Sequence, residues 1–138
     1  MITASLIFVI SLATLLQFSI SHCRSILASS RKVGLSDRVR EVAGIDGQKS
    51  VAAEDFRRLL ELVRLCPERG DDQSEIRAVG TYYGALDVFG RVCRSIIPSL
   101  AAWTERERQS CSYFAAVALD RRISYSRDLL TQQGGDRI

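Results

Sequence analysis

The sequence predicts an all-α protein in which an N-terminal transmembrane helix is followed by a small up-and-down bundle of about three main helices and a short hinge helix. Three observations lead to this fold class. The first stretch of the chain is uncharged and apolar, the remainder carries apolar residues at helical spacing, and no long segment alternates with the period of two that marks a strand.

The N-terminal segment has the length and composition of a membrane-spanning helix. Residues 1–23 contain no charged side chain, and residues 2–20 are dense in Ile, Leu, Val and Phe. At about 1.5 Å per residue, such a helix covers the roughly 30 Å hydrocarbon core of a bilayer. Its Ser, Thr and Gln side chains are uncharged and can hydrogen-bond within or between helices. We therefore expect residues 1–23 to be an uncleaved transmembrane anchor.

Two cleaved signals are the alternatives to an anchor. A signal peptide needs positive residues ahead of a shorter apolar core, and a small-x-small cleavage site after it. Here the first basic residue is Arg24, and the nearest small-x-small pattern, at residues 28–30, lies beyond it. A lipoprotein signal ending at Cys23 is disfavoured because the bulky His22 stands where that site needs a small residue.

The charge flanks of the anchor predict its orientation. Basic residues follow the apolar segment and none precedes it within the chain: Arg24, Arg31, Lys32, Arg38 and Arg40. The positive-inside rule then places the N-terminus outside and the body in the cytoplasm. With Cys23 at the membrane edge, the body retains three cysteines, and this odd number suits a reducing compartment.

The rest of the chain has the composition of a folded domain. Hydrophobic residues make up 46% of the sequence and charged residues 25%, with a formal net charge of +3. We predict four consecutive parts: the anchor at 1–23, a juxtamembrane segment and hinge at 24–49, a helical bundle domain at 50–131 and a flexible tail at 132–138.

Start and stop signals divide these parts into helices. The first helix should continue past the membrane to Lys32 and stop before Gly34, and a short helix capped by Ser36 or Asp37 should lie within residues 35–47. Pro67 and Pro98 interrupt the later chain. Two capping-box patterns mark helix starts, Asp72 with Glu75 and Thr104 with Glu107. The main helices are thus predicted over residues 50–66, 72–97 and 104–130.

Apolar spacing predicts which helix lies in the middle. The helix over residues 72–97 has the most apolar stripe, with steps of three and four through Val79, Tyr82, Leu86, Phe89, Cys93 and Ile96. We therefore expect it to be the central helix. The inner face of the last helix should consist of Ala115, Ala116, Leu119, Ile123 and Leu130.

Chemical motifs are scarce. His22 is the single histidine, no CxxC pair is present, and neither a GxGxxG nor a P-loop pattern occurs. We therefore predict no catalytic, cofactor-binding or metal site. Cys93 and Cys111 are the candidate reactive thiols, although their apolar surroundings favour packed structural cysteines. Asp87 and Arg91, four residues apart, are expected to form an ion pair.

The basic residues are the other candidates for contacts. Only two of the 19 basic residues are lysines, and the arginines offer planar, bidentate anion contacts. Candidate interaction or anion-contact residues are Arg91, Arg94, Arg106, Arg108, Arg121 and Arg122. Acidic residues interrupt this series, which favours a mixed solvated surface and argues against nucleic acid as a partner.

Taken together, the sequence predicts a single-pass membrane protein whose cytoplasmic domain acts by binding, as a scaffold, adaptor or subunit of a membrane complex. Its partners would be the lipid bilayer and another protein, or a second copy of the chain. The alternatives are a thiol-dependent enzyme or redox-active domain, and a binder of anionic lipid or nucleic acid through the arginines. The organisation is typical of small single-pass bacterial membrane proteins. Aromatic candidates for an interface are Tyr82, Tyr83, Phe89, Trp103 and Tyr113.

Overall fold

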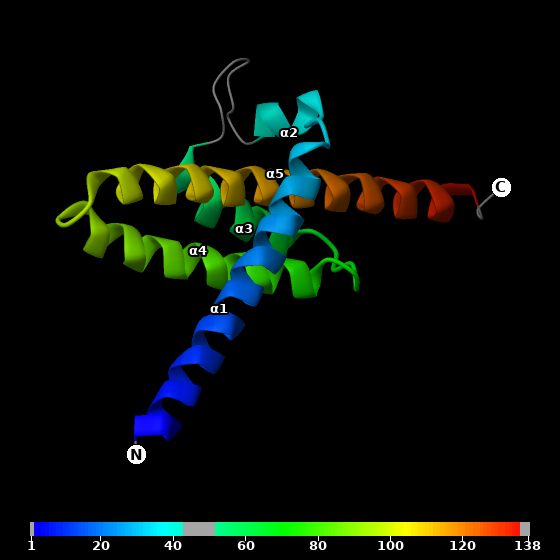
Figure 1. Cartoon of the computed structure of the whole chain (residues 1–138). Coiled ribbons are helices and arrows are strands. Elements are labelled where there is room, and N and C mark those ends of the chain that lie inside the picture. The colour runs from blue at the N-terminus through cyan, green and yellow to red at the C-terminus, as the bar shows by residue number, and fades with distance from the viewer. Residues whose placement is uncertain (1, 43–51, 136–138) are drawn as a thin grey trace.

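The computed structural model describes residues 2–42 and 52–135, and the regular structure in these ranges is entirely helical (Figure 1). The elements are α1 (Ile2–Arg31), α2 (Asp37–Val42), a 3₁₀ turn η1 (Ala53–Asp55), α3 (Phe56–Leu65), α4 (Gln73–Arg94) and α5 (Pro98–Gly135). Helices α3, α4 and α5 pack into a bundle, and α2 is the short hinge helix. The predicted all-α class is therefore confirmed.

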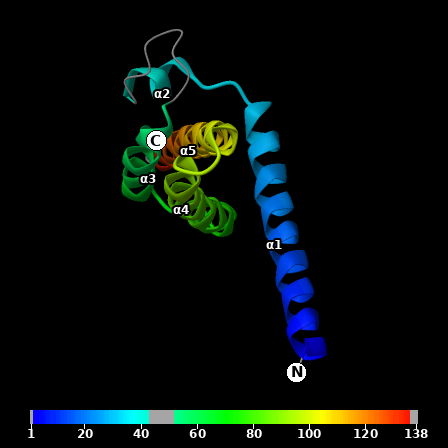
Figure 2. The same ribbon diagram turned by 60° about the vertical axis from the view of Figure 1, so that its left-hand side comes forward.

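Helix α1 has two halves with different surroundings. Residues 2–22 are exposed throughout, whereas Cys23, Leu27 and Ser30 are buried against the bundle. In Figures 1 and 2 the first half projects well beyond the body. By length and composition, α1 is long and apolar enough to cross a membrane. The helix ends at Arg31, just short of Gly34, as its sequence predicted.

The chain between α1 and α3 follows the predicted order. Helix α2 begins directly after Ser36, whose hydroxyl and amide bind the Asp120 carboxylate of α5. The helix start predicted at Ser50 lies outside the described residues, and so does the end of the range 35–47 in which the short helix was predicted. The Ala53 carbonyl in η1 accepts hydrogen bonds from the Tyr83 hydroxyl (2.9 Å) and the Ser112 hydroxyl (3.1 Å), which fixes this segment against both α4 and α5.

Prolines set the ends of the bundle helices, but Pro98 acts differently from our expectation. Helix α3 ends at Leu65, and Cys66 is extended, as the residue before Pro67 should be. Pro98, by contrast, is the first residue of α5, where its missing amide hydrogen costs nothing because that amide would have no helical partner. Helix α5 therefore starts six residues before Thr104 and runs for 38 residues to Gly135, beyond the predicted end at Leu130.

Neither predicted capping box forms. The Thr104 hydroxyl donates to the Ala101 carbonyl (2.7 Å) within α5, and Glu107 is buried. Asp72 does precede α4, but its side chain makes no capping hydrogen bond. Thr104 cannot act as a cap because it lies inside α5, where the preceding residues are already helical.

The central helix is α5, and the prediction that the helix over 72–97 is central was wrong. Helix α5 contacts every other element of the fold, and residues 114–119 are all buried. Six consecutive buried residues mean that the helix is surrounded on all sides. Its alanines at 115, 116 and 118 allow the neighbouring helices to approach closely. Phe89 and Ile96, expected in the seam of α4, are instead exposed, and so is Leu130 of α5.

Candidate functional site

The surface where α1 meets the bundle is the first candidate site. It begins at Cys23, whose thiol lies 3.8 Å from the Ala78 carbonyl of α4, within reach of a weak S–H···O bond. Leu27 continues the contact as part of the main hydrophobic cluster. From the sequence we expected Cys23 at the membrane edge, and the structure adds that its side chain is buried in the hydrophobic cluster of the body. No local pattern could have shown this, because Ala78 lies far along the chain.

A buried polar group lies beneath α1. Glu107 of α5 is 8% exposed and accepts a hydrogen bond from the Tyr82 hydroxyl of α4 (3.1 Å). The Arg24 Nε atom of α1 lies 3.8 Å from the same carboxylate. Burial and the adjacent Glu107 carboxylate raise the pKa of Tyr82, so the phenol stays protonated and remains a donor. Three helices therefore meet at one carboxylate.

Further polar contacts hold the end of α1 and the following turn on α5. Arg31 donates to the Ser110 hydroxyl, and the Tyr113 hydroxyl donates to the Val33 carbonyl (2.6 Å). The Ser36 hydroxyl lies 2.6 Å from the Asp120 carboxylate. The three hydrogen-bonding residues of α5 follow one another along the helix. The last turns of α1 and the segment after them are therefore packed on the bundle.

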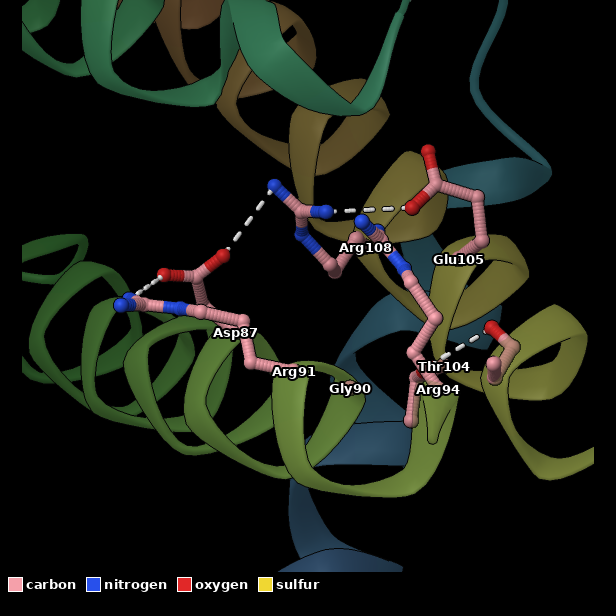
Figure 3. A pocket seen from close by; sticks show the side chains of 8 residues that line it. Asp87, Gly90, Arg91, Arg94, Thr104, Glu105 and Arg108 are labelled. Carbon is pink, nitrogen blue, oxygen red and sulfur yellow. Dashed lines mark hydrogen bonds and ion pairs between the residues drawn. The ribbon is translucent and has the colours of Figure 1, made fainter. Parts of the chain in front are cut away.

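The second candidate site is a charge cluster between α4 and α5 (Figure 3). The predicted pair between Asp87 and Arg91 is present. Arg108 of α5 joins it, with Nη2 3.4 Å from the Asp87 carboxylate and 3.1 Å from the Tyr83 hydroxyl, and with Nη1 3.1 Å from Glu105. The hydrogen bond from Arg91 holds the pKa of Asp87 below its usual range, so this carboxylate is ionised at neutral pH.

The cleft beside this cluster is small. Its volume is about 30 Å³, which is about the share of one water molecule in liquid water. Gly90 and Thr104 form its floor, and a Cβ atom added at Gly90 would lie 3.1 Å from the Thr104 hydroxyl oxygen. The glycine thus permits the close approach of α4 and α5. The cluster acts as an ion-pair network that joins two helices, and it has no room for an organic substrate.

The predicted arginines are divided among different surroundings. Arg91, Arg94 and Arg108 line the small cleft, and Arg106 is exposed elsewhere on α5. Arg121 borders an open depression together with Asp120, Asp128 and other residues of α5. Arg122 is only 4% exposed and donates to the Val63 carbonyl at the end of α3 (2.9 Å). The structure therefore does not gather these six residues on one face.

The candidate thiols are buried. Cys111 has no exposed surface, and burial, reinforced by the Glu107 carboxylate, raises its pKa to about 12. Cys93 is 7% exposed, and Cys66 is half-buried. All four cysteines are free thiols. Because Cys23 belongs to the body, the body holds an even number of cysteines, and the odd-number argument for a reducing compartment no longer applies.

His22 and the aromatic residues predicted for an interface differ in their exposure. His22 is exposed on α1, and within residues 2–42 and 52–135 no three metal-ligating side chains form a cluster. Of the aromatic candidates, Tyr82 and Tyr83 are buried, Trp103 and Tyr113 are half-buried, and Phe89 is 44% exposed. Comparison of the chain with protein-family models, with curated proteins and with solved structures found no match.

Proposed function

We propose that this chain is a single-pass membrane protein whose helical body acts by binding another protein, as a scaffold, adaptor or subunit of a membrane complex. The observation that carries the proposal is the change along α1 from complete exposure over residues 2–22 to burial at Cys23. At about 1.5 Å per residue, the exposed part is close to the roughly 30 Å thickness of a bilayer core. A bilayer would cover these apolar side chains, which the body leaves bare.

The last turns of α1 support its retention in the mature chain. Leu27 is 3% exposed and belongs to the main hydrophobic cluster. Cleavage at the small-x-small pattern of residues 28–30 would remove both Leu27 and Cys23 from that cluster. A cleaved signal would thus leave a hole in the core of the body, whereas an anchor leaves the core complete.

The orientation rests on the basic residues at the body end of the exposed segment. Arg24, Arg31 and Lys32 lie there, and such residues remain on the cytoplasmic side of a membrane segment. We therefore propose a cytoplasmic body. A C-terminal alkaline phosphatase fusion should be inactive and a C-terminal green fluorescent protein fusion should be bright. An active phosphatase fusion would reverse the orientation.

A role in binding is supported by the end of α5. Residues 124–134 are almost entirely exposed, and in Figure 1 this part of the helix extends past the other bundle helices. A helix of this length has little stability alone in water, because most helical stability in proteins comes from tertiary packing. Leu130 is 69% exposed here. A protein partner packed on this overhang would cover Leu130 and stabilise the helix.

In-cell crosslinking tests the binding role. Full-length tagged chain should be crosslinked in intact cells, solubilised in detergent and purified by its tag. A discrete adduct of defined stoichiometry is expected, and mass spectrometry distinguishes a second copy from another protein. Leu130→Asp should abolish the adduct, while the matched control Thr131→Asp, at a neighbouring exposed position, should retain it. Recovery of monomer alone from both the unmodified chain and the control would refute the proposal.

No contact in the structure specifically supports either alternative function, a thiol-dependent enzyme or a binder of anionic surfaces. A thiol-dependent enzyme needs an accessible thiolate, and Cys111 and Cys93 are both buried. A binder of anionic surfaces needs converging, unpaired arginines, whereas Arg108 and Arg122 are engaged inside the body. Binding through a membrane-anchored helical surface therefore remains the function that these contacts favour.

A further inference from the structure

Helix α4 carries an exposed apolar face that the bundle does not cover. We call it the α4 stripe, and it consists of Ala85, Val88, Phe89 and Val92 on the helix and Ile96 in the turn that follows it. Steps of three and four residues place these side chains along one side of the helix. The exposed fractions of Val88, Val92 and Ile96 are 59%, 57% and 70%. Ile97, in the connection to α5, is 46% exposed and extends the apolar surface beyond the helix.

This exposure is not a consequence of poor packing elsewhere on α4. The adjacent side of the same helix supplies Val79, Tyr82, Tyr83, Leu86 and Cys93 to the protein interior. The charged residues of the C-terminal half, Asp87, Arg91 and Arg94, line the cleft against α5 (Figure 3). Helix α4 is therefore apolar on two sides, and one of these sides has no cover within the body.

The contact between α1 and α4 fixes where the α4 stripe lies. Cys23 is the first buried residue of α1, and its thiol meets the carbonyl of Ala78 in α4. Ala78 lies on the same side of α4 as the stripe, since residues seven apart, such as Ala78, Ala85 and Val92, share a helix face. The turn of α4 around Ala78 thus lies at the level where the exposed segment of α1 ends.

The arrangement of the helices shows which side of the bundle α4 occupies. In Figures 1 and 2, α4 is the bundle helix on the side toward which the N-terminal half of α1 projects. If residues 2–22 occupy the bilayer core, α4 is the element of the body nearest to the lipid headgroups. Arg24, 58% exposed by its side chain, lies at the same boundary, where a basic side chain can reach anionic headgroups.

We propose that the α4 stripe lies in the interfacial layer of the bilayer that α1 spans, with its apolar side chains among the lipid acyl chains. An amphipathic helix that lies in the interface buries its apolar face at the boundary of headgroups and acyl chains. Two elements, one spanning and one lying flat, then orient the body against the membrane. This inference rests on the proposed membrane anchoring of α1.

Quenching by brominated lipid in vesicles tests the proposal. The full-length chain carrying Trp103→Phe provides a background without tryptophan. Three single-tryptophan variants are then compared: Val92→Trp in the stripe, Val9→Trp in the exposed half of α1, and Glu61→Trp on an exposed position of α3, away from α1 in Figure 2. Each is reconstituted in phosphatidylcholine and phosphatidylglycerol vesicles with or without bromine on the acyl chains. Circular dichroism confirms that each variant is folded.

The outcomes separate this inference from the anchoring on which it rests. Quenching of Val92→Trp should approach that of Val9→Trp and exceed that of Glu61→Trp several-fold, with a blue-shifted emission. Strong quenching of Val9→Trp together with quenching of Val92→Trp no greater than that of Glu61→Trp would overturn the interfacial placement and leave the anchor intact. Absence of quenching in all three variants would overturn both.

A photocrosslinker distinguishes lipid from a second copy on the same face. Benzoylphenylalanine incorporated in place of Val92 should give lipid adducts and no chain dimer in the same vesicles. A crosslinked dimer as the main product would show that another copy of the chain covers the stripe, and the interfacial placement would be wrong.

Discussion

Removal of the Leu27 side chain tests whether the second half of α1 belongs to the folded body. Leu27 is 3% exposed, whereas Leu16, on the same helix, is 53% exposed. Both are leucines in a continuous helix, so Leu27→Ala and Leu16→Ala change helix propensity by the same small amount. Any difference between the two variants therefore reports the docking of α1 on the bundle.

The expected magnitude follows from the burial of Leu27. Its replacement by alanine removes the equivalent of three methylene groups at about 0.8 kcal/mol each, which gives roughly 2.4 kcal/mol of lost transfer free energy. A residual cavity of roughly 40 Å³ adds about 1 kcal/mol at about 24 cal/mol per Å³. We expect Leu27→Ala to lower the free energy of unfolding by about 3 kcal/mol, and Leu16→Ala to change it by less than about 0.5 kcal/mol.

Urea unfolding of the full-length chain in mild detergent micelles provides the measurement. Trp103, the single tryptophan, is half-buried in α5 and reports the loss of the bundle through its fluorescence. Near-equal midpoints for Leu27→Ala and Leu16→Ala would mean that the turns after Cys23 are not part of the core. Cleavage within residues 28–30 would then leave the core of the body unchanged.

Three further predictions concern the body. Dithionitrobenzoate should label half-buried Cys66 well before Cys111, because Cys111 is fully buried and burial raises its pKa to about 12. Equal labelling rates for the two thiols would contradict the burial of Cys111. Asp87→Asn should cost up to about 1 kcal/mol at pH 7. Because folding lowers the pKa of Asp87, its contribution is present above the unfolded value of about 3.9 and is lost as the pH falls through the lower folded value. The difference between the chain and the variant should therefore shrink as the pH falls below about 3.9. A difference that does not shrink on acidification would assign the effect to shape rather than charge. Arg122→Ala should lower the free energy of unfolding by about 1–3 kcal/mol, because it leaves the Val63 carbonyl unpaired and removes packing. The control Ser124→Ala, on the exposed side of α5, should lower it by less than about 0.5 kcal/mol. Similar losses in the two variants would contradict the buried contact of Arg122.

Local sequence signals located many of the helix ends. The apolar run of α1, the stop before Gly34 and the break at Pro67 each depend on residues close together in the chain, and the structure confirms all three. The ion pair of Asp87 and Arg91 was equally accessible, since a spacing of four residues places both side chains on one side of a helix. Pro98 was located correctly but interpreted as a break, because proline is compatible with the end of one helix and the first turn of the next.

Contacts across the fold were beyond the reach of local patterns. Arg122 and Glu107 are charged residues and were expected at the surface, yet both are buried by helices that lie far away in sequence. Burial is tolerated because the Val63 carbonyl accepts from Arg122, and Tyr82 donates to Glu107. The sequence does not show whether a charged residue will meet a buried hydrogen-bond partner on another helix.

The sequence by itself determined the helical class, the exposed apolar length of α1 and the position of Arg24 at its end, because these depend on composition and periodicity along a single helix. Only the tertiary structure decided that Cys23 belongs to the body and that α5, not α4, is the central helix. It also decided which apolar side of α4 is buried. Periodicity shows that a helix has an apolar face, but burial depends on which neighbours reach it, and in α4 the side with Leu86 is buried whereas the side with Val92 is exposed.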